Sequence, residues 1–265
     1  MQLIDAVIVK VAMSASLGRF EYNNVTIYAE HVALLQPGEW LNDQIVSFAL
    51  HFLNHSRGAE SAEEVGVVVV DAGIVSSLRF QCDSDERRDY AGGVGVKRGC
   101  HILAPVANNR AVTDMSSHWS LLYFDVSRGV AVHFDSRAPT NARSGAAADT
   151  AQALWEMCGS GSGGDTGDAL PGGGGGVGPT LVEVQEHHIP QQRNGHDCGV
   201  YTALFARHVH EHLTQPCAPP SPIDELDSPF YAHLRAVVDQ EACDAFRADT
   251  TELLTRAIHS GGVSK

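Results

Sequence analysis

One cysteine of this chain has the surroundings that a thiol nucleophile needs. Cys198 lies in the sequence NGHDCG at 194–199, at the expected start of a helix. A thiol attacks a carbonyl carbon as the thiolate, and the unpaired N–H groups at a helix N-terminus favour an anion. Gly199 lets another backbone approach this point closely. Cys198 is therefore the candidate nucleophile.

A base, an orienting carboxylate and an oxyanion donor can be assigned to three further residues. His118 begins one expected strand and Asp135 ends the next, so a hairpin can place them side by side. A carboxylate in that position holds an imidazole in the tautomer that a general base needs. Gln192, shortly before Cys198, can aim its amide N–H₂ group at the charge that develops on the carbonyl oxygen.

Each of these residues alone is a weak indication. The chain has 14 histidines, and most histidines in proteins are surface or core residues without a catalytic role. A single buried cysteine is usually a small apolar side chain, and Asp135 before Ser136 also suits the beginning of a turn. Their combination in specific local sequences predicts a cysteine-dependent hydrolase.

Periodicity and turn residues predict the elements that position these side chains. Asn42 or Asp43 can cap a helix in which Ile45, Phe48 and Phe52 recur at helical spacing. Short strands are expected at 19–29, 67–70, 101–106, 118–125, 130–135 and 180–185, and further helices at 144–157, 198–210 and 229–258.

A glycine-rich stretch interrupts the chain between the candidate residues. Residues 159–178 read GSGSGGDTGDALPGGGGGVG, a composition that cannot bury enough apolar surface to offset its chain entropy. Because candidate residues occur on both sides, the stretch is interpreted as a disordered insertion within one catalytic domain at 1–212. A Pro-rich break and a helical extension, packed on the domain or trailing it, are expected at 213–265.

Composition excludes several classes of function. The formal net charge is −14, from 32 acidic and 18 basic residues, which argues against binding of nucleic acid or of an anionic membrane surface. It suits a basic protein partner or solubility alone. The six cysteines form no CxxC pair, so neither a metal site nor a cofactor is expected. No apolar run approaches the ~20 residues of a membrane span, and no signal peptide is expected.

Four local sequences resemble motifs of the ubiquitin-like protease family, the Ulp and sentrin-specific proteases. The sequence PQQRNGHDCGVY at 190–201 is similar to the family's nucleophile motif P-Q-Q-x-N-x-x-D-C-G-x-Y. HWSLL at 118–122 resembles its His-Trp strand, HFDS at 133–136 its Asp-Ser strand, and WLND at 40–43 its helix start. The order His, Asp, Cys also agrees with the family.

The resemblance implies a fold and a role for each residue. The fold would be α+β, a papain-like cysteine protease fold permuted so that the Cys helix comes last, with a central mixed sheet flanked by helices. Cys198 would be the nucleophile and His118 the general base and acid. Asp135 would orient the imidazole, and Gln192 would line the oxyanion hole.

The resemblance also implies a substrate and its binding residues. Trp40 and Trp119 match two tryptophans that enclose the Gly-Gly tail of a ubiquitin-like modifier, and Asp43 would contact that tail. Core packing is the alternative for Trp40. The expected enzyme is a monomeric thiol protease of the cytoplasm, the nucleus or both, which acts on a modifier of the Nedd or SUMO type and on its conjugates.

The wording of the helix-start motif and the separation of His118 from Asp135 favour the deneddylase branch of the family over the SUMO-specific branch. An acyltransferase built on the same triad and a non-catalytic modifier-binding module remain alternatives. The glycine-rich insertion departs from the family, as does His196, which stands where a tyrosine is common.

Overall fold

The computed structural model describes residues 18–53, 66–97, 99–158, 178–215 and 222–260. The expected disordered insertion at 159–178 lies outside these residues, apart from Gly178.

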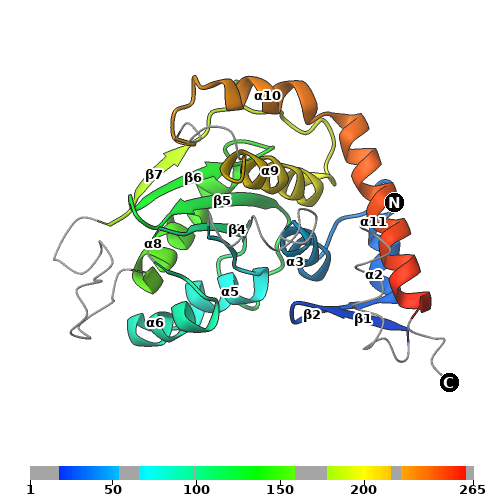
Figure 1. Cartoon of the computed structure of the whole chain (residues 1–265), viewed down its shortest axis with the longest axis horizontal. Helices are drawn as coiled ribbons and strands as arrows, with labels where there is room; N and C mark the ends of the chain where they lie inside the picture. Colours follow the sequence, from blue (N-terminus) through cyan, green and yellow to red (C-terminus); the bar gives the residue numbers. More distant parts are fainter. Residues whose placement is uncertain (1–17, 54–65, 98, 159–177, 216–221, 261–265) are drawn as a thin grey trace.

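A mixed sheet forms the centre of the molecule (Figure 1). Within the described residues it has five strands in the order β3-β4-β5-β6-β7. The outer pairs β3–β4 and β6–β7 are parallel, whereas β4, β5 and β6 are antiparallel neighbours. The strands are β3 (Val67–Val69), β4 (His101–Ala107), β5 (Trp119–Asp125), β6 (Val130–Phe134) and β7 (Thr180–Glu183).

Helices cover both faces of the sheet. Alternate residues of a strand point to opposite faces, so the apolar side chains of the central strands need a packed layer on each side. Leu121 and Tyr123 pack with α3 (Asp43–Phe52) and α9 (Cys198–Leu213), whereas Leu122 and Phe124 pack with helices of the other face. The second face carries α5 (Ala72–Phe80), α6 (Ser84–Gly93) and α8 (Ala146–Cys158) (Figure 1). Double coverage explains why the central strands are apolar almost throughout.

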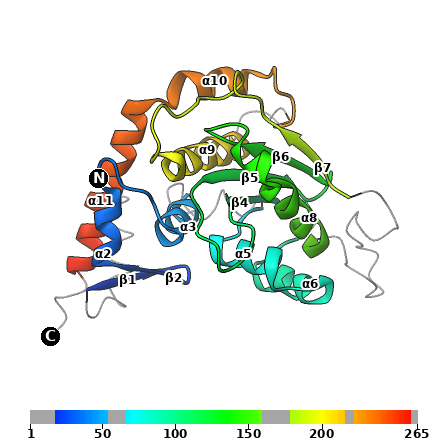
Figure 2. The ribbon, with the colours of Figure 1, turned by 180° about the vertical axis from the view of Figure 1, so that it is seen from behind.

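The C-terminal helices share the core of the first face. Phe230 of α10 (Pro229–Val237) and Phe246 of α11 (Gln240–Ser260) belong to the same buried cluster as Phe205 of α9. Figure 2 shows α11 beside α2 (Ala29–Val32) and the hairpin of β1 (Arg19–Tyr22) and β2 (Val25–Tyr28). The C-terminal tail therefore lies against the N-terminal segment that leads to Trp40.

The strand and helix predictions largely agree with the structure, with some differences. The predicted helix at 144–157 corresponds to α8, and a short helix that was not predicted, α7 (Thr140–Ser144), precedes it and ends at Gly145, which adopts a left-handed φ of 79°. The predicted helix at 229–258 is two helices, α10 and α11. Helices α5 and α6 were not predicted. Their signals are the aspartates that cap them, Asp71 on Ile74 N–H and Asp83 on Glu86 N–H.

Candidate active site

Cys198 is the first residue of α9 and is 3% exposed. The following residue must be small, because a Cβ on Gly199 would lie 3.0 Å from the Leu41 Cβ and 3.3 Å from the Val46 Cγ2. The group that approaches Gly199 is thus the Leu41 side chain and not the backbone that the sequence analysis expected. This contact joins the start of α9 to the segment that carries Trp40.

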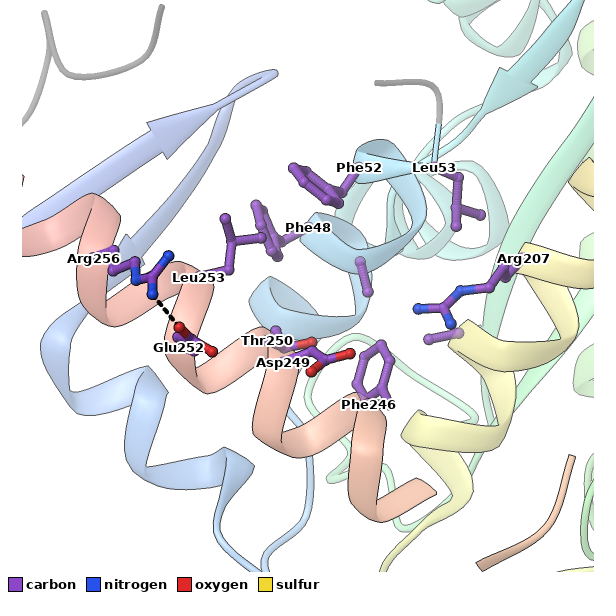
Figure 3. A pocket seen from close by; sticks show the side chains of 12 residues that line it. Phe48, Phe52, Leu53, Arg207, Phe246, Asp249, Thr250, Glu252, Leu253 and Arg256 are labelled. Atoms are coloured by element: carbon purple, nitrogen blue, oxygen red, sulfur yellow. Dashed lines mark ion pairs between the residues drawn. The ribbon is translucent and has the colours of Figure 1, made fainter. Parts of the chain in front are cut away.

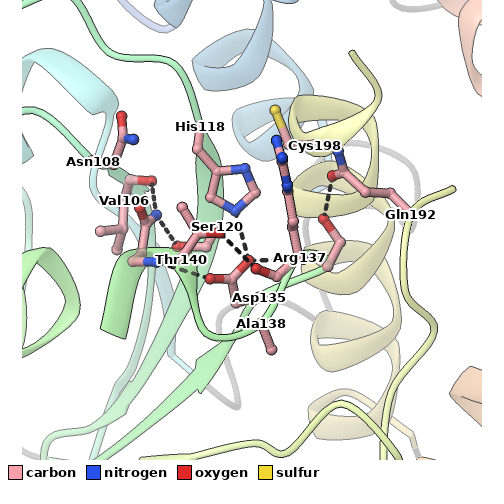
Figure 4. A network of polar contacts seen from close by, with 12 residues as sticks. Val106, Asn108, His118, Ser120, Asp135, Arg137, Ala138, Thr140, Gln192 and Cys198 are labelled. Atoms are coloured by element: carbon pink, nitrogen blue, oxygen red, sulfur yellow. Dashed lines mark hydrogen bonds and ion pairs between the residues drawn. The ribbon is translucent and has the colours of Figure 1, made fainter. Parts of the chain in front are cut away.

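The hairpin of β5 and β6 brings His118 and Asp135 together. Its antiparallel register pairs Leu121 with Phe134, and the two candidate residues lie just beyond these strands. His118 Nε2 lies 2.6 Å from Asp135 Oδ1, and both side chains are almost fully buried (Figure 4). The Cys198 side chain lies close enough to His118 to raise the pKa of the imidazole. Since Nε2 is taken by Asp135, Nδ1 is the imidazole nitrogen left for the sulfur.

The electrostatics favour an ion pair between the imidazole and the carboxylate. Burial by itself lowers the pKa of His118, but hydrogen bonds to Asp135 and Cys198 outweigh it and raise this pKa to about 9. Burial likewise raises the pKa of Asp135, but the bond to His118 outweighs it and holds this pKa below its usual value. The result is a positive charge beside the thiol, the arrangement that activates cysteine nucleophiles.

Both oxygens of the Asp135 carboxylate have further donors. The backbone N–H of Arg137 donates to Oδ1 at 2.9 Å, and the backbone N–H of Asn141 donates to Oδ2 at 2.9 Å. The side chain of Gln191 donates to the Asp135 carbonyl oxygen at 3.2 Å. The carboxylate is therefore fixed from several directions before it meets the imidazole.

Gln192 is held near the start of α9 by both ends of its amide (Figure 4). Its Oε1 accepts from the Ser136 hydroxyl at 2.8 Å, and its Nε2 donates to the Asn194 carbonyl oxygen at 2.8 Å. An amide nitrogen has two hydrogens, so one remains for a substrate oxygen. The structure thus leaves Gln192 with a free hydrogen and a fixed orientation.

The candidate tail-binding residues lie around Leu41. The indole N–H of Trp119 donates to the Leu41 carbonyl oxygen at 3.0 Å, which brings Trp119 to the residue next to Trp40. Trp40 is 48% exposed, so it does not fill the core. Asn42 caps α3 by accepting from the Ile45 N–H at 3.0 Å, which leaves the exposed Asp43 as the first helical residue.

A buried arginine near the end of the sequence connects the residue before Cys198 to the segment before Trp40, and it was not among the predicted site residues. Arg247 of α11 pairs with Asp197, the residue before the candidate nucleophile, with 2.7 Å between Nη2 and Oδ1. Its guanidinium also donates to three carbonyl oxygens of the segment before Trp40, those of Leu34, Gln36 and Glu39. No local pattern marks Arg247, because its partners are distant in the sequence.

Asp197 has further donors besides Arg247. Its Oδ2 accepts from Asn194 Nδ2 at 2.7 Å and from Gln240 Nε2 at 3.1 Å. Burial raises the pKa of Asp197, but these hydrogen bonds and the guanidinium outweigh it and leave this pKa below its usual value. Asp197 is therefore a buried carboxylate that depends on its partners.

An apolar cavity of about 290 Å³ lies elsewhere, among α3, α9 and α11 (Figure 3). Phe48, Phe52, Phe246 and Leu253 line it, with Arg207 at its edge. None of the candidate catalytic or tail-binding residues contributes to it. The cavity is therefore separate from the chemistry at Cys198.

Across the described ranges, His, Cys, Asp and Glu side chains form no group of three or more that could hold a metal ion. No helix in the same part of the chain combines the length and the apolar character needed to cross a membrane. Cys82, Cys100, Cys158, Cys198 and Cys243 are free thiols.

A mixed sheet with a histidine and an aspartate at one hairpin, facing a cysteine at the start of the helix packed on it, defines a cysteine protease with a papain-like fold. No family model matches the sequence. The chain is 26% identical over 189 residues to the probable sentrin-specific protease 8 of Dictyostelium discoideum. The aligned region covers 68% of this chain and 70% of that protein.

Two further relatives extend the comparison. Sentrin-specific protease 8 of Rattus norvegicus is 24% identical over 79% of this chain and 86% of its own. NEDD8-specific protease 1 of Arabidopsis thaliana is 24% identical over 72% of this chain and 74% of its own. The chain is therefore similar in sequence to the ubiquitin-like proteases of the Ulp and sentrin-specific group.

Solved structures support the fold. The SUMO protease Ulp1 with an oxidised catalytic cysteine superposes with a TM-score of 0.60, at 19% identity, over 97% of this chain and 96% of that one. The Ulp1 protease domain in complex with SMT3 gives a TM-score of 0.58 at the same identity. The expected α+β, papain-like fold with a central mixed sheet is confirmed.

Proposed function

We propose that this chain is a thiol protease that cleaves after the C-terminal Gly-Gly of a ubiquitin-like modifier, as a deneddylase-type isopeptidase or processing protease. The observation that carries the proposal is the buried pair of His118 and Asp135, with the Cys198 side chain close enough to raise the pKa of His118. Relatives named for sentrin and for NEDD8 support the class of substrate.

The first half of the reaction forms a thioester. The Cys198 thiolate attacks the carbonyl carbon of the terminal glycine, and the carbonyl electrons move onto its oxygen. The free amide hydrogen of Gln192 and the backbone N–H of Cys198 stabilise this oxyanion. As the carbonyl re-forms, the C–N bond breaks, and the His118 imidazolium gives its proton to the leaving amine.

The second half releases the modifier. His118, now neutral, takes a proton from water, and the resulting hydroxide attacks the thioester carbon. The modifier leaves as a carboxylic acid that loses its proton to solvent and becomes the C-terminal carboxylate, and Cys198 returns as the thiolate beside the imidazolium. Asp135 keeps Nε2 of the imidazole protonated throughout, so that Nδ1 exchanges the proton.

The substrate tail would enter along Trp40 and Trp119. The indole of Trp40 is exposed, and the indole of Trp119 hydrogen-bonds Leu41, the next residue after Trp40. Leu41 in turn lies against Gly199 at the start of α9. Glycine has no side chain, so a slot between two indoles would admit Gly-Gly and exclude ordinary peptides. Asp43, exposed at the start of α3, would contact the tail.

A panel of modifier probes tests the proposal. Each probe carries one modifier with an electrophile in place of its C-terminal carboxylate, and labelling of Cys198 is measured by mass spectrometry. We expect the Nedd-type probe to label wild-type protein fastest and Cys198→Ala to remain unlabelled while it still binds the modifier.

The other outcomes distinguish the alternatives. Preferential labelling by the SUMO probe would assign the SUMO-specific branch. Modifier binding without any cleavage by wild-type protein would indicate a binding module. Labelling by acetyl-CoA with no modifier cleavage would indicate an acyltransferase. Full activity of Cys198→Ala would remove Cys198 from the mechanism.

A further inference from the structure

A chain of buried hydrogen bonds runs from the Asp135 carboxylate into the sheet, and Figure 4 shows its beginning around Asp135 and Ser120. Asn141 donates from its backbone N–H to Asp135 Oδ2 at 2.9 Å and from Nδ2 to Ser120 Oγ at 2.5 Å. His133 follows, with Nε2 2.8 Å from Ser120 Oγ and Nδ1 2.5 Å from Glu183 Oε2. Asn141, Ser120 and His133 are each at most 1% exposed.

The direction of donation along this chain follows from which groups have hydrogens. Asn141 Nδ2 also lies 3.0 Å from the Val106 carbonyl oxygen, which only accepts, so both amide hydrogens are used. Ser120 Oγ therefore accepts from Asn141. In the described part of the chain its own hydrogen has one acceptor within reach, His133 Nε2.

His133 is consequently fixed in one tautomer. Its Nε2 accepts from Ser120, so Nε2 has no hydrogen, and the ring proton is on Nδ1. This proton is donated to the carboxylate of Glu183, which has no hydrogen to donate in return. Glu183 is half-buried on the edge strand β7, whereas Asn141, Ser120 and His133 are buried inside the protein.

The Ser120 hydroxyl, the His133 imidazole and the Glu183 carboxylate are the three kinds of group found in a serine hydrolase, but they are not a second active site. Ser120 is 1% exposed and His133 is 0% exposed, so no substrate reaches the hydroxyl. A residue that no substrate can touch acts only through its neighbours.

We propose that His133 and Glu183 are positioning residues for Asp135. Glu183 selects the Nδ1–H tautomer of His133, and the free Nε2 accepts the Ser120 hydroxyl. Ser120 then fixes the side chain of Asn141, whose backbone N–H holds the carboxylate. The inference rests on the proposed function, because it assigns to Asp135 the role of orienting the catalytic imidazole.

Removing the Glu183 carboxylate should interrupt the chain of hydrogen bonds at the end away from Asp135. In Glu183→Met the His133 tautomer is no longer selected, and a hydrogen on Nε2 would compete with the Ser120 hydroxyl hydrogen. We expect kcat to fall roughly 10-fold with KM unchanged, which is less than the about 100-fold that a 1 Å misplacement of a reacting group costs. Glu183→Gln keeps an oxygen that accepts from Nδ1–H and should restore wild-type kcat.

Glu156→Met is the matched control. Glu156 has a similar exposure, 26% against 33% for Glu183, and its removal likewise takes away the carboxylate partner of a nearby side chain, here Arg87. It lies on α8, away from the carboxylate chain. We expect its kcat to match wild type. An equal loss of kcat in Glu156→Met and Glu183→Met would overturn the proposal, because the loss would then reflect general destabilisation.

Two measurements need no modifier, so they separate this inference from the proposed function. The ¹⁵N shifts of His133 should show a protonated Nδ1 and an unprotonated Nε2 at pH 7; the opposite assignment would overturn the inference. Alkylation of Cys198 by iodoacetamide, followed at its peptide, should be slower in Glu183→Met than in wild type and Glu183→Gln. Equal rates in all three would overturn the positioning role, even if no modifier were cleaved.

Discussion

Replacing Arg247 by methionine should destabilise the protein far more than the loss of one hydrogen bond. Methionine keeps much of the side-chain volume but removes the guanidinium that pairs with Asp197, which is 1% exposed. Breaking a buried ion pair by removing one partner costs about 3–5 kcal/mol, because the other charge stays buried. The carbonyl oxygens of Gln36 and Glu39 belong to exposed residues, so water replaces their lost donor at little cost.

That free energy is large against the total stability of a domain, about 5–15 kcal/mol. At roughly 2 °C per kcal/mol for a chain of this size, Tm should fall by about 6–10 °C. Urea unfolding followed by circular dichroism measures the free-energy loss directly, and calorimetry measures Tm.

Arg128→Met is the control, because it removes a pair of better geometry at the surface. Arg128 contacts Asp224 through two bonds of 2.6 and 2.7 Å, but its side chain is 45% exposed. Surface pairs contribute about 0–1 kcal/mol, so burial and not distance should decide which variant loses more. If Arg247→Met and Arg128→Met lost the same free energy of unfolding, the claim that burial decides the loss would be refuted.

The pH dependence supplies a second check of the same argument. The folded-state pKa of Asp197 is lowered, so its contribution to stability is present above its ordinary value of 3.8 and is lost as pH falls through the folded value. Without Arg247 this pKa should rise. The gap in free energy of unfolding between wild type and Arg247→Met should therefore narrow as pH falls from the raised pKa of the variant towards the lower pKa of wild type, because Asp197 is protonated first in the variant. In the Arg247→Met background Asp197→Asn should stabilise the protein; a further loss there would contradict the charge argument.

Three further variants test the site and its surroundings. Asp135→Asn should lower kcat by about 10²–10⁴-fold through loss of tautomer control, and wild-type rates would make Asp135 merely structural. The raised pKa of His118 contributes stability that is present below pH 6.5 and lost as pH rises through about 9, so the stability gap between wild type and this variant should narrow over that range in urea titrations. Gly199→Ala should cost about 1–3 kcal/mol, because the new methyl group meets Leu41 at 3.0 Å; an unchanged Tm would show that Leu41 moves aside freely. Deleting 159–178 should leave peptidase activity nearly intact, and failure of the protein to fold would contradict its interpretation as an insertion.

Local sequence was enough for the elements that carry the chemistry. Short apolar runs rich in aromatic and β-branched residues marked β5 and β6, and a turn ending at Gly129 joined them, so the meeting of His118 and Asp135 was predictable from the hairpin alone. Cys198 at the first residue of α9 likewise followed from the residues around it. Such features depend on neighbours within a short stretch of chain.

Tertiary structure decided which distant groups support that chemistry. Arg247 reaches Asp197 across the fold, and Glu183 reaches His133 only because β7 pairs with β6 in one particular register. Nothing in the residues beside Arg247 or Glu183 distinguishes them from surface charges. A single sequence records which side chains follow one another, whereas burial and pairing between remote segments arise when the chain packs. The sequence therefore determined the candidate reacting groups, and packing determined which side chains hold them in place.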